Sequence, residues 1–139
     1  MKYALYVESS ALVAAMFDGD ATARRAILAA PHRVASALTI AESRRAVVRA
    51  AERQPLRMET RLAFAEFLRE FEAKCLVVSI TADILARVGR PFAVEPVRTL
   101  DAIHLATVEL IDRPPELVHV LTRDRRVADN ARAMGCRVV

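Results

Sequence analysis

The 139-residue sequence lacks any apolar run long enough to cross a membrane. Its apolar residues come in short runs that Arg, Glu or Asp interrupt, whereas a membrane-spanning helix needs about 20 consecutive apolar residues. Met1 to Val7 contains one lysine and a β-type run, without the long apolar segment and small-residue cleavage site of a signal peptide. We therefore expect a cytoplasmic protein without a membrane segment.

Cysteine and lysine are both scarce. Cys75 and Cys136 lie far apart and match neither a CxxC pair nor a zinc spacing, so we expect buried thiols and no disulfide. Lys2 and Lys74 are the only lysines, so the net charge of +4 and the pI near 9.7 come almost entirely from arginine. The planar guanidinium suits phosphate. A genomic bias toward arginine and alanine is the alternative explanation, although it would not explain where the arginines cluster.

The length and the 54% of apolar residues fit one domain, residues 1–139. Short β-type runs alternate with helical patterns along the whole chain. The expected strands are Tyr3–Val7, Arg33–Ala37, Leu76–Ser79, Leu117–Leu121 and Arg137–Val139. The expected helices are Ala11–Phe17, Ala21–Ala30, Thr39–Arg53, Met58–Ala73, Thr81–Val88, Leu100–Ile111 and Arg125–Met134. This alternation predicts an α/β fold with a mostly parallel central sheet of about five strands, sandwiched by helices.

Four acidic residues occupy positions where such a fold gathers its functional groups. Glu8 directly follows the first strand, Glu42 lies near the start of the helix after the second, and Asp124 follows the fourth. Asp101 lies in the first turn of the almost wholly apolar helix Leu100–Ile111. Because function in an open parallel sheet collects at the carboxyl ends of the strands, we expect these acids to meet in one anionic crevice.

Each acid also has an ordinary structural interpretation. Thr39 to Glu42 fits a capping box, and Asp124 could cap the last helix. Asp101 could interact favourably with the dipole of a helix that Thr99 caps. Glu8 is harder to explain in this way, because Ser9 or Ser10 would cap the first helix better. Together, unpaired carboxylates repel one another, and a bound cation removes that cost. Hard cations such as Mg²⁺ and Mn²⁺ take oxygen ligands and drive phosphodiester hydrolysis.

The acids lie in four motifs that occur in order and cover Lys2 to Val139. These are YVESSALV at 6–13, TIAE at 39–42, TLDAIHLAT at 99–107 and LTRD at 121–124. The set resembles the motifs of PIN-domain ribonucleases, specifically the VapC-like toxins of bacterial toxin-antitoxin pairs. LDAIHLAT and TRD are specific in this order and at this spacing, whereas the first motif alone is weak.

The resemblance implies a Mg²⁺- or Mn²⁺-dependent endoribonuclease with a PIN-like fold, an RNA substrate, a VapB-like antitoxin and a homodimeric state. Glu8, Glu42, Asp101 and Asp124 match the acidic positions that hold metal and carry catalysis, and Ser10 matches the hydroxyl residue beside the first acid. Asp129 is a candidate outer participant, with a solvated helix position as the simpler interpretation.

One position departs from the family pattern, because the first acid of the family is nearly always Asp and here it is Glu8. Mg²⁺ demands near-ideal octahedral geometry at about 2.0–2.1 Å, so the extra methylene could weaken metal binding or change the metal preference. Glu8 is either a tolerated ligand or a sign of reduced activity.

Several arginines lie near the expected crevice. Arg45, Arg49 and Arg53 follow Glu42 at three- and four-residue spacing and so share one helix face, and Arg123 precedes Asp124. These residues are candidates for contacting the RNA backbone. The alternatives are a solvated face, with Glu42 paired to Arg45, or a surface that contacts an antitoxin.

Other residues have mainly structural interpretations. We expect His104 to be a core or partner-facing histidine rather than a metal ligand, since His32 and His119 form no cluster with it. The stripe of Phe64, Phe67 and Phe71 is expected to belong chiefly to the core, although it could also form a groove for an amphipathic antitoxin segment.

Two other functional classes remain open from the sequence. A noncatalytic PIN-like binding module would keep the fold and the basic surface but lack productive metal, and Glu8 is the feature that supports it. A phosphoacceptor receiver domain also collects acids at strand ends but needs a nearby lysine, and Lys2 and Lys74 are poorly placed for that role.

Overall fold

The computed structural model describes all residues from 1 to 139. None of its helices is long and apolar enough to span a bilayer. The strands are β1 Ala4–Val7, β2 His32–Ser36, β3 Leu76–Val78, β4 Val118–Leu121 and β5 Arg137–Val138. The α-helices are α1 Ser9–Phe17, α2 Ala21–Ala29, α3 Ala37–Arg53, α4 Met58–Ala73, α5 Ala82–Val88, α6 Thr99–Glu109 and α7 Arg125–Ala133, and a short 3₁₀ helix, η1, covers Pro115–Leu117.

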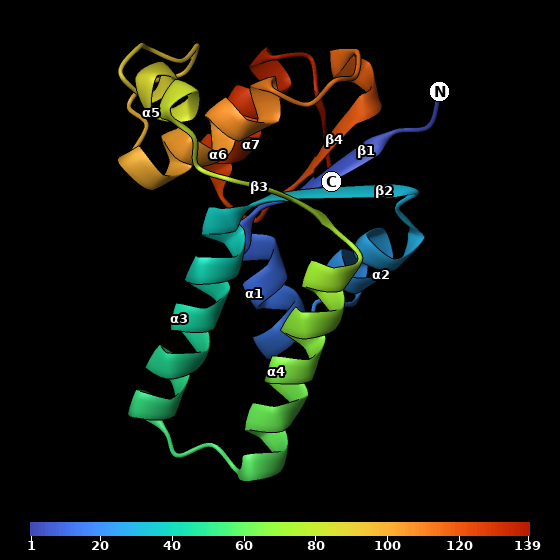
Figure 1. Ribbon diagram of the computed structural model, residues 1–139, viewed down its shortest axis with the longest axis vertical. Helices are drawn as coiled ribbons and strands as arrows, with labels where there is room; N and C mark the ends of the chain where they lie inside the picture. Colours follow the sequence, from blue (N-terminus) through green and yellow to red (C-terminus); the bar gives the residue numbers. More distant parts are fainter.

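The five strands form one sheet in the order β3-β2-β1-β4-β5, and every neighbouring pair is parallel. Helices α5, α6 and α7 cover one face, and α1 to α4 lie on the other (Figure 1). The predicted α/β sandwich with a parallel sheet of about five strands is therefore confirmed. The carboxyl ends of β1, β2 and β4 lie next to one another, because these three strands are parallel neighbours in the sheet.

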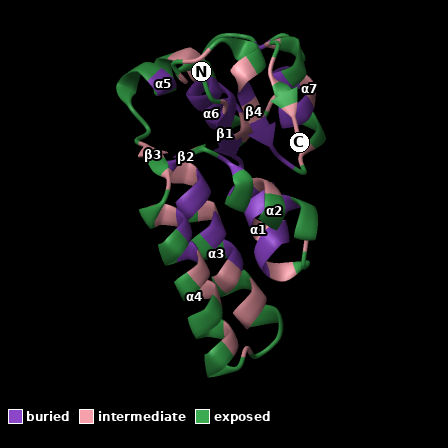
Figure 2. Ribbon diagram, turned by 90° about the vertical axis from the view of Figure 1, so that its right-hand side faces the viewer, coloured by how far each residue is buried: buried purple, intermediate pink, exposed green.

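Strand β1 divides the core into two halves. Its four residues are all buried, with Ala4 and Tyr6 in the cluster under α6 and α7, and Leu5 and Val7 in the cluster under α1. This alternation follows from the two-residue period of a strand. Buried residues accordingly concentrate around the sheet in Figure 2, while the far end of α3 and α4 is mostly exposed.

Helices α3 and α4 form a long hairpin that projects from the sheet (Figure 1). The aromatic stripe on α4 faces inward at its upper end, where Phe71 is buried, and Phe64 packs against Phe17 with ring centroids 4.5 Å apart. Phe67 contacts the Arg24 guanidinium at 5.1 Å from the ring centroid. The stripe therefore serves mainly to attach the hairpin to α1 and α2, as expected for core residues.

Two helix starts differ from the sequence prediction. Helix α3 begins at Ala37, and Ser36 caps it by accepting a hydrogen bond from the Leu38 amide at 3.0 Å. The capping box proposed for Thr39 is therefore wrong, and the buried Thr39 hydroxyl instead donates to the Val7 carbonyl at 3.0 Å. Helix α6 already includes Thr99, so Thr99 does not cap it, and the extended residue before it is Arg98.

Cys75 and Cys136 are free thiols, each partly buried. Burial raises the pKa of Cys75 to about 12 and also raises the pKa of Cys136 above its ordinary value. A thiol that keeps its proton is a poor nucleophile and a poor metal ligand. The two cysteines thus remain separate thiols, as the sequence predicts.

The central position of α1 predicts a specific stability difference. Leu12 is 0% exposed in the core under α1, and replacing it with alanine removes several buried atoms and leaves a cavity. We expect Leu12→Ala to lower the free energy of unfolding by about 2–5 kcal/mol in urea titrations. Leu28→Ala is the matched control, since Leu28 on α2 is 74% exposed. Equal losses in the two variants would contradict this description of the core.

Candidate functional site

The carboxyl edge of the sheet brings the predicted acids into one region. Glu8 directly follows β1, Glu42 lies on α3 after β2, and Asp124 follows β4 and caps α7. Asp101 lies in the first turn of α6. Burial raises the pKa of Asp101, and the charges of Asp124 and Glu42 both raise it further.

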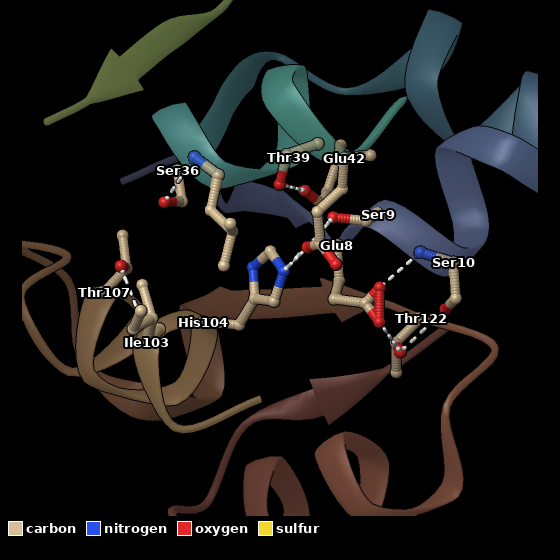
Figure 3. Close-up of polar contacts among 12 residues, drawn as sticks. Glu8, Ser9, Ser10, Ser36, Thr39, Glu42, Ile103, His104, Thr107 and Thr122 are labelled. Atoms are coloured by element: carbon tan, nitrogen blue, oxygen red, sulfur yellow. Dashed lines mark hydrogen bonds and ion pairs between the residues drawn. The ribbon is translucent and has the colours of Figure 1, made fainter. Parts of the chain in front are cut away.

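Glu8 is occupied by contacts within the protein (Figure 3). It is 3% exposed and is itself the N-cap of α1, where its carboxylate accepts a hydrogen bond from the Ser10 amide. The other carboxylate oxygen accepts from the Thr122 hydroxyl at 3.2 Å. The expectation that Ser9 or Ser10 caps this helix is therefore wrong. Burial raises the pKa of Glu8, and these hydrogen bonds oppose that shift only in part.

Ser10 and Thr122 connect the first acid to the fourth. The Ser10 hydroxyl lies 3.3 Å from the Thr122 hydroxyl and accepts from the Arg123 amide at 2.8 Å. The Thr122 oxygen also accepts from the Asp124 amide at 3.0 Å. These bonds join the turn after β4, which carries Asp124, to the start of α1, which follows Glu8.

Glu42 is held by only one of its two oxygens. Its Oε1 accepts from the Ser9 hydroxyl at 2.6 Å and from His104 Nε2 at 2.8 Å, while Oε2 has no hydrogen bond within the protein. Burial alone would raise the pKa of Glu42, but the bonds from His104 and Ser9 outweigh burial and lower it. The side chain therefore presents an ionised carboxylate with one free oxygen.

Asp101 and Asp124 also keep free oxygens. Asp124 uses Oδ1 to accept from the Arg126 and Val127 amides at 2.9 and 3.0 Å, as predicted for a helix cap, and its Oδ2 has no partner. The Asp101 carboxylate accepts no hydrogen bond from the chain, and burial, followed by the charge of Asp124, raises its pKa. Burial and the neighbouring acids therefore outweigh the opposing charges of His104 and Arg98 on this carboxylate.

The donor set suits a hard cation, because Glu42, Asp101 and Asp124 each offer a free carboxylate oxygen. In their present conformations, however, no three His, Cys, Asp or Glu side chains converge closely enough to hold a metal ion together. The fit therefore rests on donor chemistry and on the repulsion among the acids. Binding would need at least Asp101, whose carboxylate no hydrogen bond holds, to turn toward the free oxygens of Glu42 and Asp124.

The remaining candidate residues differ in their exposure and in whether they form ion pairs within the protein. Arg45 and Arg49 are exposed on α3, and Arg49 is near enough for its charge to lower the pKa of Glu42. Arg123 is held by Asp20 through an ion pair of 2.8 Å and by the carbonyls of Thr122 and Val139. Asp129 forms an exposed ion pair with Arg132, three residues later on α7, at 3.5 Å.

Three residues of this region were not singled out as site residues by the sequence. Ser9 and His104 hold Glu42, and Thr122 holds Glu8. His104 is 2% exposed and fully hydrogen-bonded, so its interpretation as a core histidine is confirmed. The only signal in the sequence is that each of the three lies within three residues of a predicted acid. This signal is weak, because no spacing rule identifies which acid each residue contacts.

Comparisons with known proteins agree on one family. The family model of the PIN domain matches residues 5–133. Ribonuclease VapC46 of Mycobacterium tuberculosis (strain ATCC 25618 / H37Rv) is 34% identical over 138 residues, which cover 98% of this chain and 96% of the relative. Ribonuclease VapC45 of strain CDC 1551 / Oshkosh is 34% identical over 130 residues, covering 93% of this chain and 81% of that protein.

A solved structure has the same fold. The crystal structure of PAE2754 from Pyrobaculum aerophilum aligns with a TM-score of 0.66 over 99% of this chain and 84% of that one. The two sequences are 19% identical, so this likeness speaks for the fold alone.

The raised pKa of Asp101 predicts a pH-dependent change in stability. The folded protein holds a proton on Asp101 more firmly than the unfolded chain does, so the favourable contribution is present at acid pH and lost as the pH rises through the raised pKa. Asp101→Asn cannot ionise. We expect it to raise the Tm at pH 7 in EDTA by on the order of a few degrees, and to lose this advantage below about pH 4.

Thermal unfolding at both pH values, with Glu116→Gln as control, measures this effect. Glu116 is exposed beside the amino end of β4, at the opposite edge of the sheet. Identical Tm values for the wild type and Asp101→Asn at pH 7 would contradict the proposed crowding of negative charge.

Proposed function

This chain belongs to the PIN-domain family, with VapC ribonucleases among its relatives, and we propose that it is a metal-dependent endoribonuclease that hydrolyses RNA phosphodiester bonds. We further propose that it is the toxin of a VapBC-type toxin-antitoxin pair. The single observation that best supports catalysis is the Asp101 carboxylate, which has no hydrogen-bond partner and lies beside the charges of Asp124 and Glu42. A structural acid would be paired, whereas a metal ligand must stay available.

In this proposal Glu42, Asp101 and Asp124 hold the metal through their free oxygens. A bound Mg²⁺ or Mn²⁺ would activate water and stabilise the charge that develops on the phosphate. The Asp124 side chain stays oriented by the α7 amides, and the Ser9 and His104 donors orient Glu42. Glu8 is the fourth proposed acid, and its bonds to Ser10 and Thr122 leave each of its oxygens only one further acceptor site for a cation.

The RNA backbone is proposed to follow the exposed face of α3. Arg45 and Arg49 lie one and two turns beyond Glu42, so their guanidinium groups extend the site with positive charge. Arg123 is the weaker candidate, because Asp20 already neutralises it. In place of direct contact, Arg123 supports the turn that carries Asp124.

The same proposal includes a VapB-like antitoxin, a homodimeric assembly and a cytoplasmic location. The projecting α3–α4 hairpin offers an antitoxin exposed apolar side chains, with Val48 at 41%, Met58 at 67% and Leu62 at 61% exposure. Apolar groups gathered on one projecting element are typical of a surface that binds a helix.

One observation favours a second candidate function. Both oxygens of Glu8 are used within the protein, as expected if the first acidic position has lost its role and the chain is a noncatalytic PIN-like binding module. The receiver-domain alternative has less support. Lys2 and Lys74 precede β1 and β3, so both lie at the amino edge of the sheet, away from the acids.

Cleavage of RNA tests the proposal directly. We expect purified protein to cut a pool of structured RNAs with Mg²⁺ or Mn²⁺ but not with EDTA, and Asp101→Asn to lower the rate by on the order of 10²-fold or more, since it removes an anionic oxygen donor. Glu116→Gln, the same chemical change at the opposite edge, should cut like the wild type. Cleavage that persists in EDTA, or that Asp101→Asn leaves intact, would reject this assignment of the site.

Glu8→Asp separates the two candidate functions. Aspartate is a good N-cap, but it is one methylene too short to keep both the Ser10 and the Thr122 contacts, so one oxygen is freed toward the crevice. We expect faster RNA cleavage than in the wild type under the same metal. If neither the wild type nor Glu8→Asp cuts RNA in either metal, without antitoxin, the noncatalytic module becomes the better description.

A further inference from the structure

A row of polar side chains runs from the core of the protein to Glu42, one of the four acids. Tyr6 on β1 is 0% exposed and His104 on α6 is 2% exposed, and the row ends at Glu42 on α3. The three residues come from three different elements, and His104 is separated from Tyr6 by 98 positions and from Glu42 by 62. Figure 3 shows the His104 ring directed at Glu42.

We infer that His104, itself held by Tyr6, is a positioning residue that fixes one oxygen of Glu42 and leaves the other directed to a divalent cation. This inference rests on the proposed nuclease function. His104 contacts no metal in this arrangement, because both ring nitrogens are already hydrogen-bonded. It acts only through Glu42.

The hydrogen-bond chemistry fixes which nitrogen carries a proton. The Glu42 carboxylate only accepts, so His104 Nε2, at 2.8 Å, must donate to it. In the neutral ring Nδ1 is then an acceptor, and the Tyr6 hydroxyl at 2.6 Å donates to it. Burial, and after it the charge of Glu8, raises the pKa of Tyr6, so this hydroxyl keeps its proton.

A second donor, Ser9, holds Glu42 together with His104, and we call these two residues the clamp on Glu42. The Ser9 hydroxyl donates to the same Oε1 at 2.6 Å and lies 3.1 Å from His104 Nε2. Two donors from α1 and α6 therefore converge on one oxygen, which restricts rotation of a flexible side chain. Because Oε2 has no partner, the clamp prepares a single oxygen for a ligand.

The burial of this histidine also needs an explanation. His104 lies among the apolar residues of α6, where Ile103 and Leu105 on either side belong to the core. A leucine would fill such a position without the cost of burying two polar nitrogens. The hydrogen bonds to Tyr6 and Glu42 offset this cost, and they also orient Glu42, much as partners behind a metal ligand fix its geometry elsewhere.

Mn²⁺ affinity measured by titration calorimetry provides the main test. We expect His104→Leu to weaken Mn²⁺ binding by about 10- to 100-fold. His104→Gln, whose amide can still donate to Glu42, should recover part of the loss, and Tyr6→Phe should show a smaller loss. In RNA cleavage, kcat should fall more than KM changes, because RNA contacts are untouched.

The matched control is Leu105→Ala on the same helix. Leu105 is 0% exposed, so this variant lowers the Tm through lost packing but leaves the clamp in place, and its Mn²⁺ affinity should equal that of the wild type. If His104→Leu binds Mn²⁺ as tightly as the wild type, or if Leu105→Ala loses affinity to the same extent, the positioning role is rejected.

A metal-free readout separates this inference from the nuclease proposal. The ¹⁵N chemical shifts of His104 in the wild-type protein should show a proton on Nε2, and a ring protonated on Nδ1 alone would overturn the inference whatever the activity. If the wild type does not bind Mn²⁺ at all, the metal-dependent function fails, and the inference fails with it. If Mn²⁺ binding is unchanged in His104→Leu, the positioning role of His104 is rejected and the nuclease proposal stands.

Discussion

The structure depends on the burial of β1 between two parallel neighbours. Its four residues are fully enclosed, pair with β2 on one side and β4 on the other, and supply both halves of the core. A strand enclosed in this way cannot shift its register by one residue without moving Tyr6 and Val7 to the wrong faces. The position of Glu8, and of everything attached to it, follows from that constraint.

The four acids differ in how their oxygens are used. Glu8 has given both oxygens to the helix start and to Thr122, whereas Glu42 and Asp124 give one each and Asp101 gives none. The number of carboxylate oxygens that accept hydrogen bonds therefore falls from two in Glu8 to none in Asp101. Because hydrogen-bonded oxygens stiffen a side chain and free ones remain available, the acids combine rigidly held side chains with one, Asp101, whose oxygens are both free.

The parts of the fold that the sequence predicts are those with local signals. The β-type runs locate the strands, and Asp124 is a helix cap as its residue type indicates. The cap by Glu8 was missed because glutamate is not among the residues that favour this position. The Tyr6–His104–Glu42 row could not be predicted, because its partners meet only after α6 packs across the sheet.

The arginines of the projecting hairpin lie in a less tightly packed part of the protein than the acids do. Arg49 and Arg53 lie in the outer turns of α3, where Val48 and Met58 of the hairpin are exposed, while Glu42 lies in the turns that pack on α1. Elements with few buried contacts open at a lower free energy than the core, and their amide hydrogens exchange with solvent earlier. On warming, the outer turns of the hairpin would therefore loosen before the carboxylates separate, and the spacing between the arginines and the acids would be lost before the acids themselves come apart.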